Sequence, residues 1–88
     1  MRVHNANDLG NVIRERRGEL GWTQARLAAE VGVSRRWLSD LEAGKSTAAF
    51  SLILRTLGTL GLIVDLQPEK EPGQLDLDRY LSGFGTGL

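Results

Sequence analysis

The sequence contains no cysteine and only one histidine, and these shortages exclude several classes of function. Without cysteine the chain has neither a disulfide framework nor a thiolate metal site, which is typical of a reducing cytoplasm. A single histidine, His4, cannot build a histidine metal cluster or a Ser-His-Asp arrangement. The glycine-rich segment 82–87 lacks the lysine and the following helix of a phosphate-binding loop. We therefore expect a protein that is not an enzyme and needs no cofactor.

Long apolar runs are also missing. No stretch approaches the ~20 residues that a membrane helix needs, and the N-terminus has no secretory apolar segment. With 88 residues the chain has room for one domain with a modest core. We expect a soluble protein of the cytoplasm, associated with the nucleoid and without a membrane partner.

Neither sign of charge is in excess, because 11 Lys or Arg residues balance 11 Asp or Glu residues. The balance hides a division between two parts of the chain. Residues 1–60 hold nine basic and six acidic residues (+3), whereas residues 61–88 hold two basic and five acidic residues (−3). This asymmetry predicts different partners for the two parts, although an acidic tail that is only solvated is the alternative. Because the basic excess is small, two copies on one site should bind phosphate groups better than one.

The sequence does contain a pattern of two short helices joined by a tight turn, within residues 21–45. Thr23 is placed to cap the first helix, and Gly32 supplies the turn because glycine readily adopts a positive φ. Ser34 is placed to cap the second helix, and Gly44 ends it. Two helices joined in this way, with the second presented outward, form the helix-turn-helix that enters the DNA major groove. The pattern predicts a protein that binds duplex DNA.

Apolar residues at helical spacing predict one helix before this pair and another after it. The earlier helix should be capped by Asn7 or Asp8, and the later one by Thr47. The four apolar stripes are enough to enclose one small core. The residues expected in these stripes are Leu9, Val12, Ile13, Leu20, Leu27, Ala28, Val31, Leu38, Leu41, Phe50, Ile53, Leu54, Leu57 and Leu60.

This arrangement resembles the Xre/Cro type of phage-repressor helix-turn-helix, over roughly residues 9–60. The matching residues are Leu20-Gly21-Trp22-Thr23-Gln24, Leu27-Ala28, Gly32-Val33-Ser34 and Leu41-Glu42-Ala43-Gly44-Lys45. The resemblance implies an all-α, lambda-repressor-like domain of four to five helices.

Two arginines, Arg35 and Arg36, lie in the first turn of the expected recognition helix, the end that contacts base edges. The arginine side chain matches guanine O6 and N7, and a cation at a helix N-terminus is unfavourable for the helix itself. Which arginine contacts a base stays open. Asp40, one turn later, can accept from cytosine N4 or orient Arg36 at the i, i+4 spacing. The predicted DNA contacts are Gln24, Ser34, Arg35, Arg36, Trp37, Ser39, Asp40 and Lys45.

The Xre/Cro resemblance assigns further roles. It implies that Gln24 contacts a phosphate and braces the recognition helix, at a helix N-terminus where phosphates bind readily. Lys45 is a second phosphate candidate. The resemblance also implies a partly buried ion pair between Arg17 and Glu42, which ties the first helix to the third. Trp37 either packs against the fourth helix or presents its ring to DNA.

After residue 60 the apolar residues alternate as in a β-strand, and Pro68 ends the alternation. A lone strand needs a partner for its backbone groups, and the same strand of a second copy is the simplest one. We therefore predict a homodimer that binds a palindromic operator. The alternative is that this segment is the frayed end of the fourth helix. The residues predicted to form the dimer contact are Leu62, Ile63, Val64 and Leu66.

One C-terminal strand after the fourth helix, followed by a short tail, resembles the HipB-type antitoxins of HipA/HipB modules. The residues that carry this likeness are Val33-Ser-Arg-Arg-Trp-Leu-Ser-Asp-Leu-Glu42 and Leu57-Gly-Thr-Leu-Gly-Leu-Ile-Val-Asp65. The resemblance implies a dimer that represses its own operon and holds a HipA-type Ser/Thr kinase toxin inactive. A stand-alone Xre-family repressor and a protein-interaction module without DNA binding remain the alternatives.

The chain is expected to divide into a DNA-binding and dimerisation domain, residues 1–66, and a flexible acidic tail, residues 67–88. The tail has too many apolar residues for a pure spacer and too many glycines to bury them alone. Such a composition is typical of a segment that becomes ordered on a partner. The residues predicted to contact the toxin are Leu77, Tyr80, Leu81 and Phe84.

Overall fold

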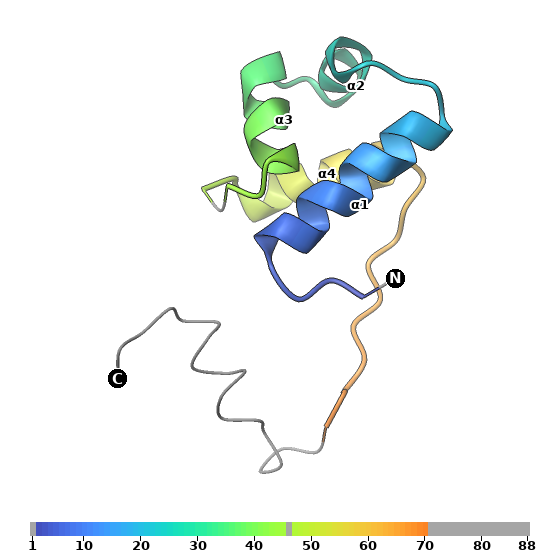
Figure 1. The fold of residues 1–88 in the computed structure, drawn as a ribbon, viewed down its shortest axis with the longest axis vertical. Coiled ribbons are helices and arrows are strands. Elements are labelled where there is room, and N and C mark those ends of the chain that lie inside the picture. Colours follow the sequence, from blue (N-terminus) through green and yellow to red (C-terminus); the bar gives the residue numbers. More distant parts are fainter. Residues whose placement is uncertain (1, 46, 71–88) are drawn as a thin grey trace.

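The computed structural model describes residues 2–45 and 47–70 of the chain. Figure 1 shows α2 and α3 together at one end of the molecule, with α1 in front of α4. This part of the chain holds no strand, so the prediction of an all-α helix-turn-helix fold is confirmed. None of its helices is long and apolar enough to cross a membrane. The four helices are α1 (Ala6–Glu19), α2 (Gln24–Val31), α3 (Arg35–Glu42) and α4 (Phe50–Thr59).

The core lies where the four helices meet, and every helix contributes to it. Ile13 of α1, Leu27 of α2 and Leu38 of α3 are completely buried, and burial of each such side chain contributes about 1.5–3 kcal/mol relative to exposure. All of the buried apolar residues belong to the stripes expected from the sequence. They are Ile13, Leu27, Ala28, Val31, Leu38, Leu41, Leu57 and Leu60.

The expected stripe of α4 is wrong at two positions, because Phe50 and Leu54 are 67% and 42% exposed. The helix instead turns Thr56 into the core, where this side chain is completely buried. Its hydroxyl donates to the Leu52 carbonyl oxygen at 2.8 Å, so the buried polar group is satisfied within the helix. Leu20, at the end of α1, is also more exposed than expected, at 37%.

The two caps predicted within the helix-turn-helix are confirmed. The Thr23 hydroxyl accepts from the Arg26 N–H at 3.1 Å at the start of α2. The Ser34 hydroxyl accepts from the Trp37 N–H at 2.9 Å at the start of α3. Gly32 between these helices has a φ of 86°, as the predicted turn requires.

The two caps predicted for the outer helices are wrong. Asn5 caps α1, and its side chain accepts from the Asp8 N–H at 2.8 Å, so neither Asn7 nor Asp8 is the cap. Ala49 stands at the N-cap of α4 without a side-chain hydrogen bond, and Thr47 lies outside the helix. Asn and Thr are common in loops as well as at caps, so several candidates in a row leave the boundary open by a turn.

All four helices end in the same motif, in which a glycine of positive φ follows the last turn. For α3, Gly44 has a φ of 84°, and its N–H donates to the Leu41 carbonyl oxygen at 3.1 Å. The next N–H, that of Lys45, returns to the Asp40 carbonyl oxygen at 3.0 Å, which completes a Schellman motif. The chain after α3 therefore turns back beside the last turn of the helix. The four glycines are Gly21, Gly32, Gly44 and Gly61.

Residues 62–68 form neither helix nor strand within one chain. Because α4 ends at Thr59 and Gly61 has a φ of 75°, this segment is not the frayed end of the helix. Ile63 and Leu66 are each 89% exposed. Their pairing with a second copy stays a prediction. The four residues predicted to contact a toxin lie beyond residue 70, outside the described residues.

Candidate nucleic-acid interface

The recognition helix α3 is anchored by its inner face and exposes its first turn. Leu38 and Leu41 are 0% and 2% exposed, so they fix how the helix is rotated against the core. Arg35 and Arg36 consequently lie on the outer surface, and the Arg36 side chain is 86% exposed. An arginine pair at a capped and exposed helix N-terminus is well placed to enter a groove of duplex DNA.

The remaining predicted contacts lie around this helix. Ser39 and Lys45 are exposed, and Trp37 is partly buried against the core. Ser34 uses its hydroxyl oxygen as the helix cap, which leaves the hydroxyl proton to donate to a phosphate oxygen. The structure thus places the predicted residues on α3, at its two ends and at the start of α2.

Asp40 lies on α3 between two of the predicted DNA-contacting cations. Its Oδ1 accepts from the Lys45 Nζ at 3.2 Å, and its Oδ2 lies 3.9 Å from the Arg36 Nε. The contact with Arg36 has the i, i+4 spacing that the sequence suggested. The contact with Lys45 was not expected from the sequence, but the Schellman glycine at position 44 is the signal that would have revealed it.

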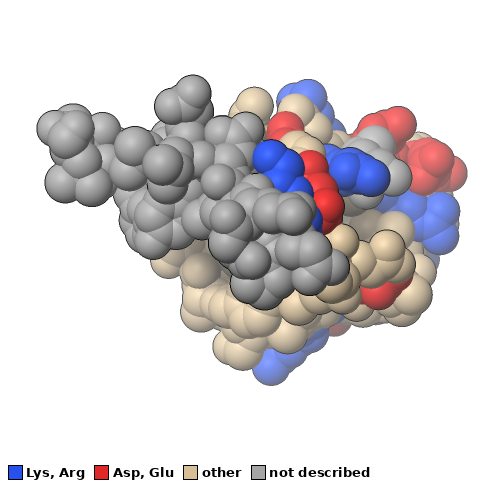
Figure 2. Space-filling view, turned by 90° about the horizontal axis from the view of Figure 1, so that it is seen from below, with Lys and Arg blue, Asp and Glu red and all other residues tan. Residues whose placement is uncertain are grey.

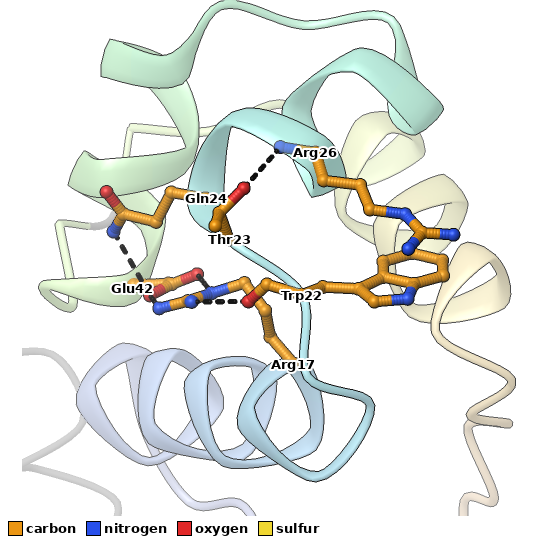
Figure 3. Close-up of polar contacts among 6 residues, drawn as sticks. All are labelled: Arg17, Trp22, Thr23, Gln24, Arg26 and Glu42. Atoms are coloured by element: carbon orange, nitrogen blue, oxygen red, sulfur yellow. Dashed lines mark hydrogen bonds and ion pairs between the residues drawn. The ribbon is translucent and has the colours of Figure 1, made fainter.

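A partly buried polar network joins α1, α2 and α3 at the base of the recognition helix (Figure 3). The Arg17 guanidinium binds Glu42 in a bidentate manner, with Nε donating to Oε2 and Nη2 to Oε1, both at 2.9 Å. The remaining Nη1 donates to the Trp22 carbonyl oxygen at 2.9 Å. The Gln24 Nε2 donates to the same Glu42 Oε1 at 3.2 Å. The Gln24 amide is therefore held against the last turn of α3.

The Arg17–Glu42 pair is nearly removed from solvent, with side chains 16% and 3% exposed. Hydrogen bonding to Glu42 raises the pKa of the Arg17 guanidinium, and this effect outweighs the opposite effect of burial. Arg17 therefore stays charged at neutral pH. Paired with each other and hydrogen-bonded to Trp22 and Gln24, the two groups fix the position of α3 relative to α1.

Sequence reasoning missed Arg26, which lies beside this network in the first turn of α2. Its guanidinium carbon is 4.4 Å from the centroid of the Trp22 ring, a cation–π contact (Figure 3). The contact joins the residue just before the Thr23 cap to the first turn of the helix. Because Trp22 precedes the helix, its spacing from Arg26 gave no helical signal.

Charges of both signs share the surface. Seen from below, basic and acidic side chains lie among one another and among uncharged residues (Figure 2). This mixture agrees with the small basic excess of residues 1–60. Among the described residues, no group of three or more His, Cys, Asp or Glu side chains is placed to hold a metal ion.

Comparison with known families identifies the class of protein. Residues 8–68 match the family described as a helix-turn-helix domain, which is more than half of the 88-residue chain. The chain belongs to this family. With its fold and its similarity to solved HipB structures, it is an Xre-type helix-turn-helix DNA-binding regulator.

Two curated relatives carry the same description, "Uncharacterized HTH-type transcriptional regulator". The one named y4mF, from Sinorhizobium fredii, is 40% identical over 65 residues, which are 74% of this chain and 86% of the relative. The other, from Methanothermobacter thermautotrophicus, is 44% identical over 50 residues, which are 57% of this chain and 72% of the relative.

The similar solved structures include HipB in a complex with an O2 20mer. It is 26% identical to this chain, with a TM-score of 0.72, over 80% of this chain and 97% of HipB. A HipA–HipB–O2–O3 complex contains a chain that is 24% identical, with the same TM-score of 0.72, over 80% of this chain and 99% of the other. The similarity to the chain in the HipA–HipB–O2–O3 complex shows a shared fold alone.

Proposed function

We propose that this chain is the antitoxin of a toxin–antitoxin pair, a dimeric repressor that binds a palindromic operator and neutralises a HipA-type Ser/Thr kinase. The observation that carries the DNA-binding part is the exposed arginine pair on a helix whose inner face is buried. Arg35 and Arg36 contact base edges from α3, with Ser39, Asp40 and Trp37 beside them. Phosphate contacts come from Gln24, Ser34 and Lys45, at the ends of α2 and α3.

Selection of bound sequences from random duplexes tests DNA binding and yields the operator. On the selected duplex, Arg35→Ala or Arg36→Ala should weaken binding by about 1–3 kcal/mol while leaving the helical circular dichroism unchanged. Arg14→Ala is the control, since this exposed arginine lies on α1, outside the helix-turn-helix. Selection without enrichment, or unchanged affinity of both arginine variants, would contradict the assignment. The first outcome would also favour a protein-interaction module.

The homodimer is proposed on the exposed apolar residues that follow α4. Ile63, Val64 and Leu66 are 89%, 48% and 89% exposed in one chain, and an antiparallel ribbon with a second copy would cover them and pair their backbone groups. Leu62, which is partly buried against the core of its own chain, completes the proposed contact within the domain of residues 1–66. A two-fold dimer should recognise half-sites about 34–36 Å apart. Sedimentation of a monomer at concentrations that saturate the selected duplex would contradict the dimer.

The toxin partner is proposed from the likeness to HipB, one of whose structures is a complex with HipA, O2 and O3. Contacts are placed partly in the tail of residues 67–88, at Leu77, Tyr80, Leu81 and Phe84. Deletion of residues 75–88 should leave operator binding nearly unchanged and weaken binding to a kinase encoded beside this gene. Full neutralisation by the shortened chain would exclude the tail as the anchor. A genome with no such kinase would favour the stand-alone repressor.

A further inference from the structure

Asp40 is an acidic residue in the middle of a surface that is proposed to meet a polyanion. Its side chain is 38% exposed, and it lies on α3 one turn after Arg36. Phosphate groups of DNA would repel a carboxylate at this place, unless the carboxylate contacts a hydrogen-bond donor. The residue therefore needs an explanation either in the fold or in recognition.

The fold gives Asp40 no evident structural task. An acidic residue in the last turn of a helix opposes the helix dipole, so its charge does not stabilise α3. Its ion pairs are exposed, since the side chains of Lys45 and Arg36 are 61% and 86% exposed, and pairs of this kind contribute about 0–1 kcal/mol. The Leu38 and Leu41 side chains already anchor the helix without it.

The Asp40 carboxylate instead pairs with two cations, Lys45 and Arg36, which DNA would otherwise attract. The Schellman motif places Lys45 beside α3 through the backbone hydrogen bond to the Asp40 carbonyl oxygen. The side chains then meet at 3.2 Å, so the same residue holds Lys45 through both its main chain and its carboxylate. The second carboxylate oxygen faces Arg36 at 3.9 Å. Lys45 and Arg36 must therefore break their contacts with the Asp40 carboxylate before they can contact a phosphate or a base.

We propose that Asp40 is a specificity-determining residue that weakens binding to non-operator DNA. On an arbitrary duplex, Lys45 and Arg36 leave the carboxylate, which then faces the phosphates unpaired. On the operator, a base amine such as cytosine N4 donates to the carboxylate and offsets this cost. Asp40 thus favours the operator in two ways: its carboxylate is repelled by the phosphates of other DNA, and it accepts a hydrogen bond from an operator base. The inference rests on the proposed binding of DNA through α3.

The test compares Asp40→Asn and Asp40→Ala in the full chain, on the selected duplex and on a scrambled duplex of equal length and composition. Asn removes the charge and keeps an acceptor, whereas Ala removes both. On scrambled DNA both variants should bind about three- to tenfold more tightly, with a salt slope steeper by about one unit. On the selected duplex Asp40→Asn should gain less, and Asp40→Ala should bind more weakly than the wild type.

Glu19→Gln is the matched control, because it removes the same charge from an exposed residue at the end of α1, away from α3 (Figure 1). It should leave the ratio of the two affinities unchanged. An unchanged ratio in both Asp40 variants would overturn the inference, while tight binding of the wild type to its selected duplex would leave the proposed function standing. If the wild type selects no duplex, both proposals fail.

Discussion

The first and third helices carry their charges in opposite orders. In α1, Asp8 lies in the first turn, and in the last turn Arg16 and Arg17 outnumber Glu19, so the net charge at both ends complements the helix dipole. In α3, the first turn holds two arginines and no acid, and the end of the helix holds Asp40 and Glu42 and no base. The first order stabilises a helix, and the second opposes it.

This difference shows which helix supports the other. An isolated helix shorter than about 12–15 residues is marginal in water even with favourable charges. The 8 residues of α3 therefore depend on tertiary contacts, whereas α1 has 14 residues, a side-chain cap and a favourable charge order. Because α1 and the core hold α3 in place, the outer face of α3 is free to carry residues chosen for recognition.

The contact between these helices is close enough to explain that support. At the crossing, Gly10 of α1 faces the carbonyl oxygens of Leu41 and Glu42, so the two backbones approach directly. The Arg17–Glu42 pair closes the contact at the other end of α1. A steric contact at Gly10 and an ionic contact at Arg17 therefore both hold α3 against α1, and each can be removed by its own substitution.

The largest effect is expected from removal of the ionic contact. Arg17→Met should lower the free energy of unfolding by about 3–5 kcal/mol, because it leaves the buried Glu42 carboxylate without its cation. The methionine side chain keeps most of the apolar stem, so the loss reports the charge. Urea denaturation followed by circular dichroism measures it. Arg14→Met is the control at an exposed position of α1. Equal losses in the two variants would show that α3 does not depend on the pair.

Disturbing the steric contact at Gly10 should lower the free energy of unfolding by less than loss of the ion pair does. The control substitution on the same helix, at Gly18, should raise it. A Cβ at position 10 would lie 2.5 Å from the Glu42 carbonyl oxygen and 2.6 Å from that of Leu41. Gly10→Ala must therefore separate the helices and should lower the free energy of unfolding by about 1–3 kcal/mol. Gly18→Ala, on the same helix with nothing within 4 Å of the added Cβ, should raise it by about 0.5–1 kcal/mol. Stabilisation by both substitutions would show that the crossing is loose.

These two contacts also mark what could be predicted from the sequence. Helical spacing located all of the buried apolar residues, because their periods in α2 and α3 are regular. Thr23 and Ser34 as caps followed from their position just before those periods. The close approach of the two helices at Gly10 could not be predicted from the sequence, since a glycine inside a helix is equally consistent with an exposed site such as Gly18.

The errors on α4 have a similar cause. Its sequence offers two overlapping apolar stripes, and hydrophobicity alone favoured the one with Phe50 and Leu54. The helix buries Thr56 instead, which costs little because the threonine hydroxyl donates to the Leu52 carbonyl oxygen within the same helix. The position of Lys45 beside Asp40 likewise depends on how the chain leaves α3, and in the sequence only Gly44 points to that turn.

The smallest effect tests the charge orders themselves. Asp8→Asn in α1 should lower the free energy of unfolding by about 0.3–1 kcal/mol, because the charge at the helix N-terminus is lost while an acceptor for the His4 N–H remains. Asp40→Asn in α3 removes a charge that opposes the dipole and loses only exposed ion pairs, so stability should stay within about 0.5 kcal/mol or rise.

Thermal unfolding at low salt measures the effects of both substitutions, and 1 M salt should reduce the difference between them because it screens exposed charges. A loss at Asp40 as large as that at Asp8 would mean that the Asp40 carboxylate serves the fold. The proposed role of Asp40 in rejecting non-operator DNA would then lose its main physical support.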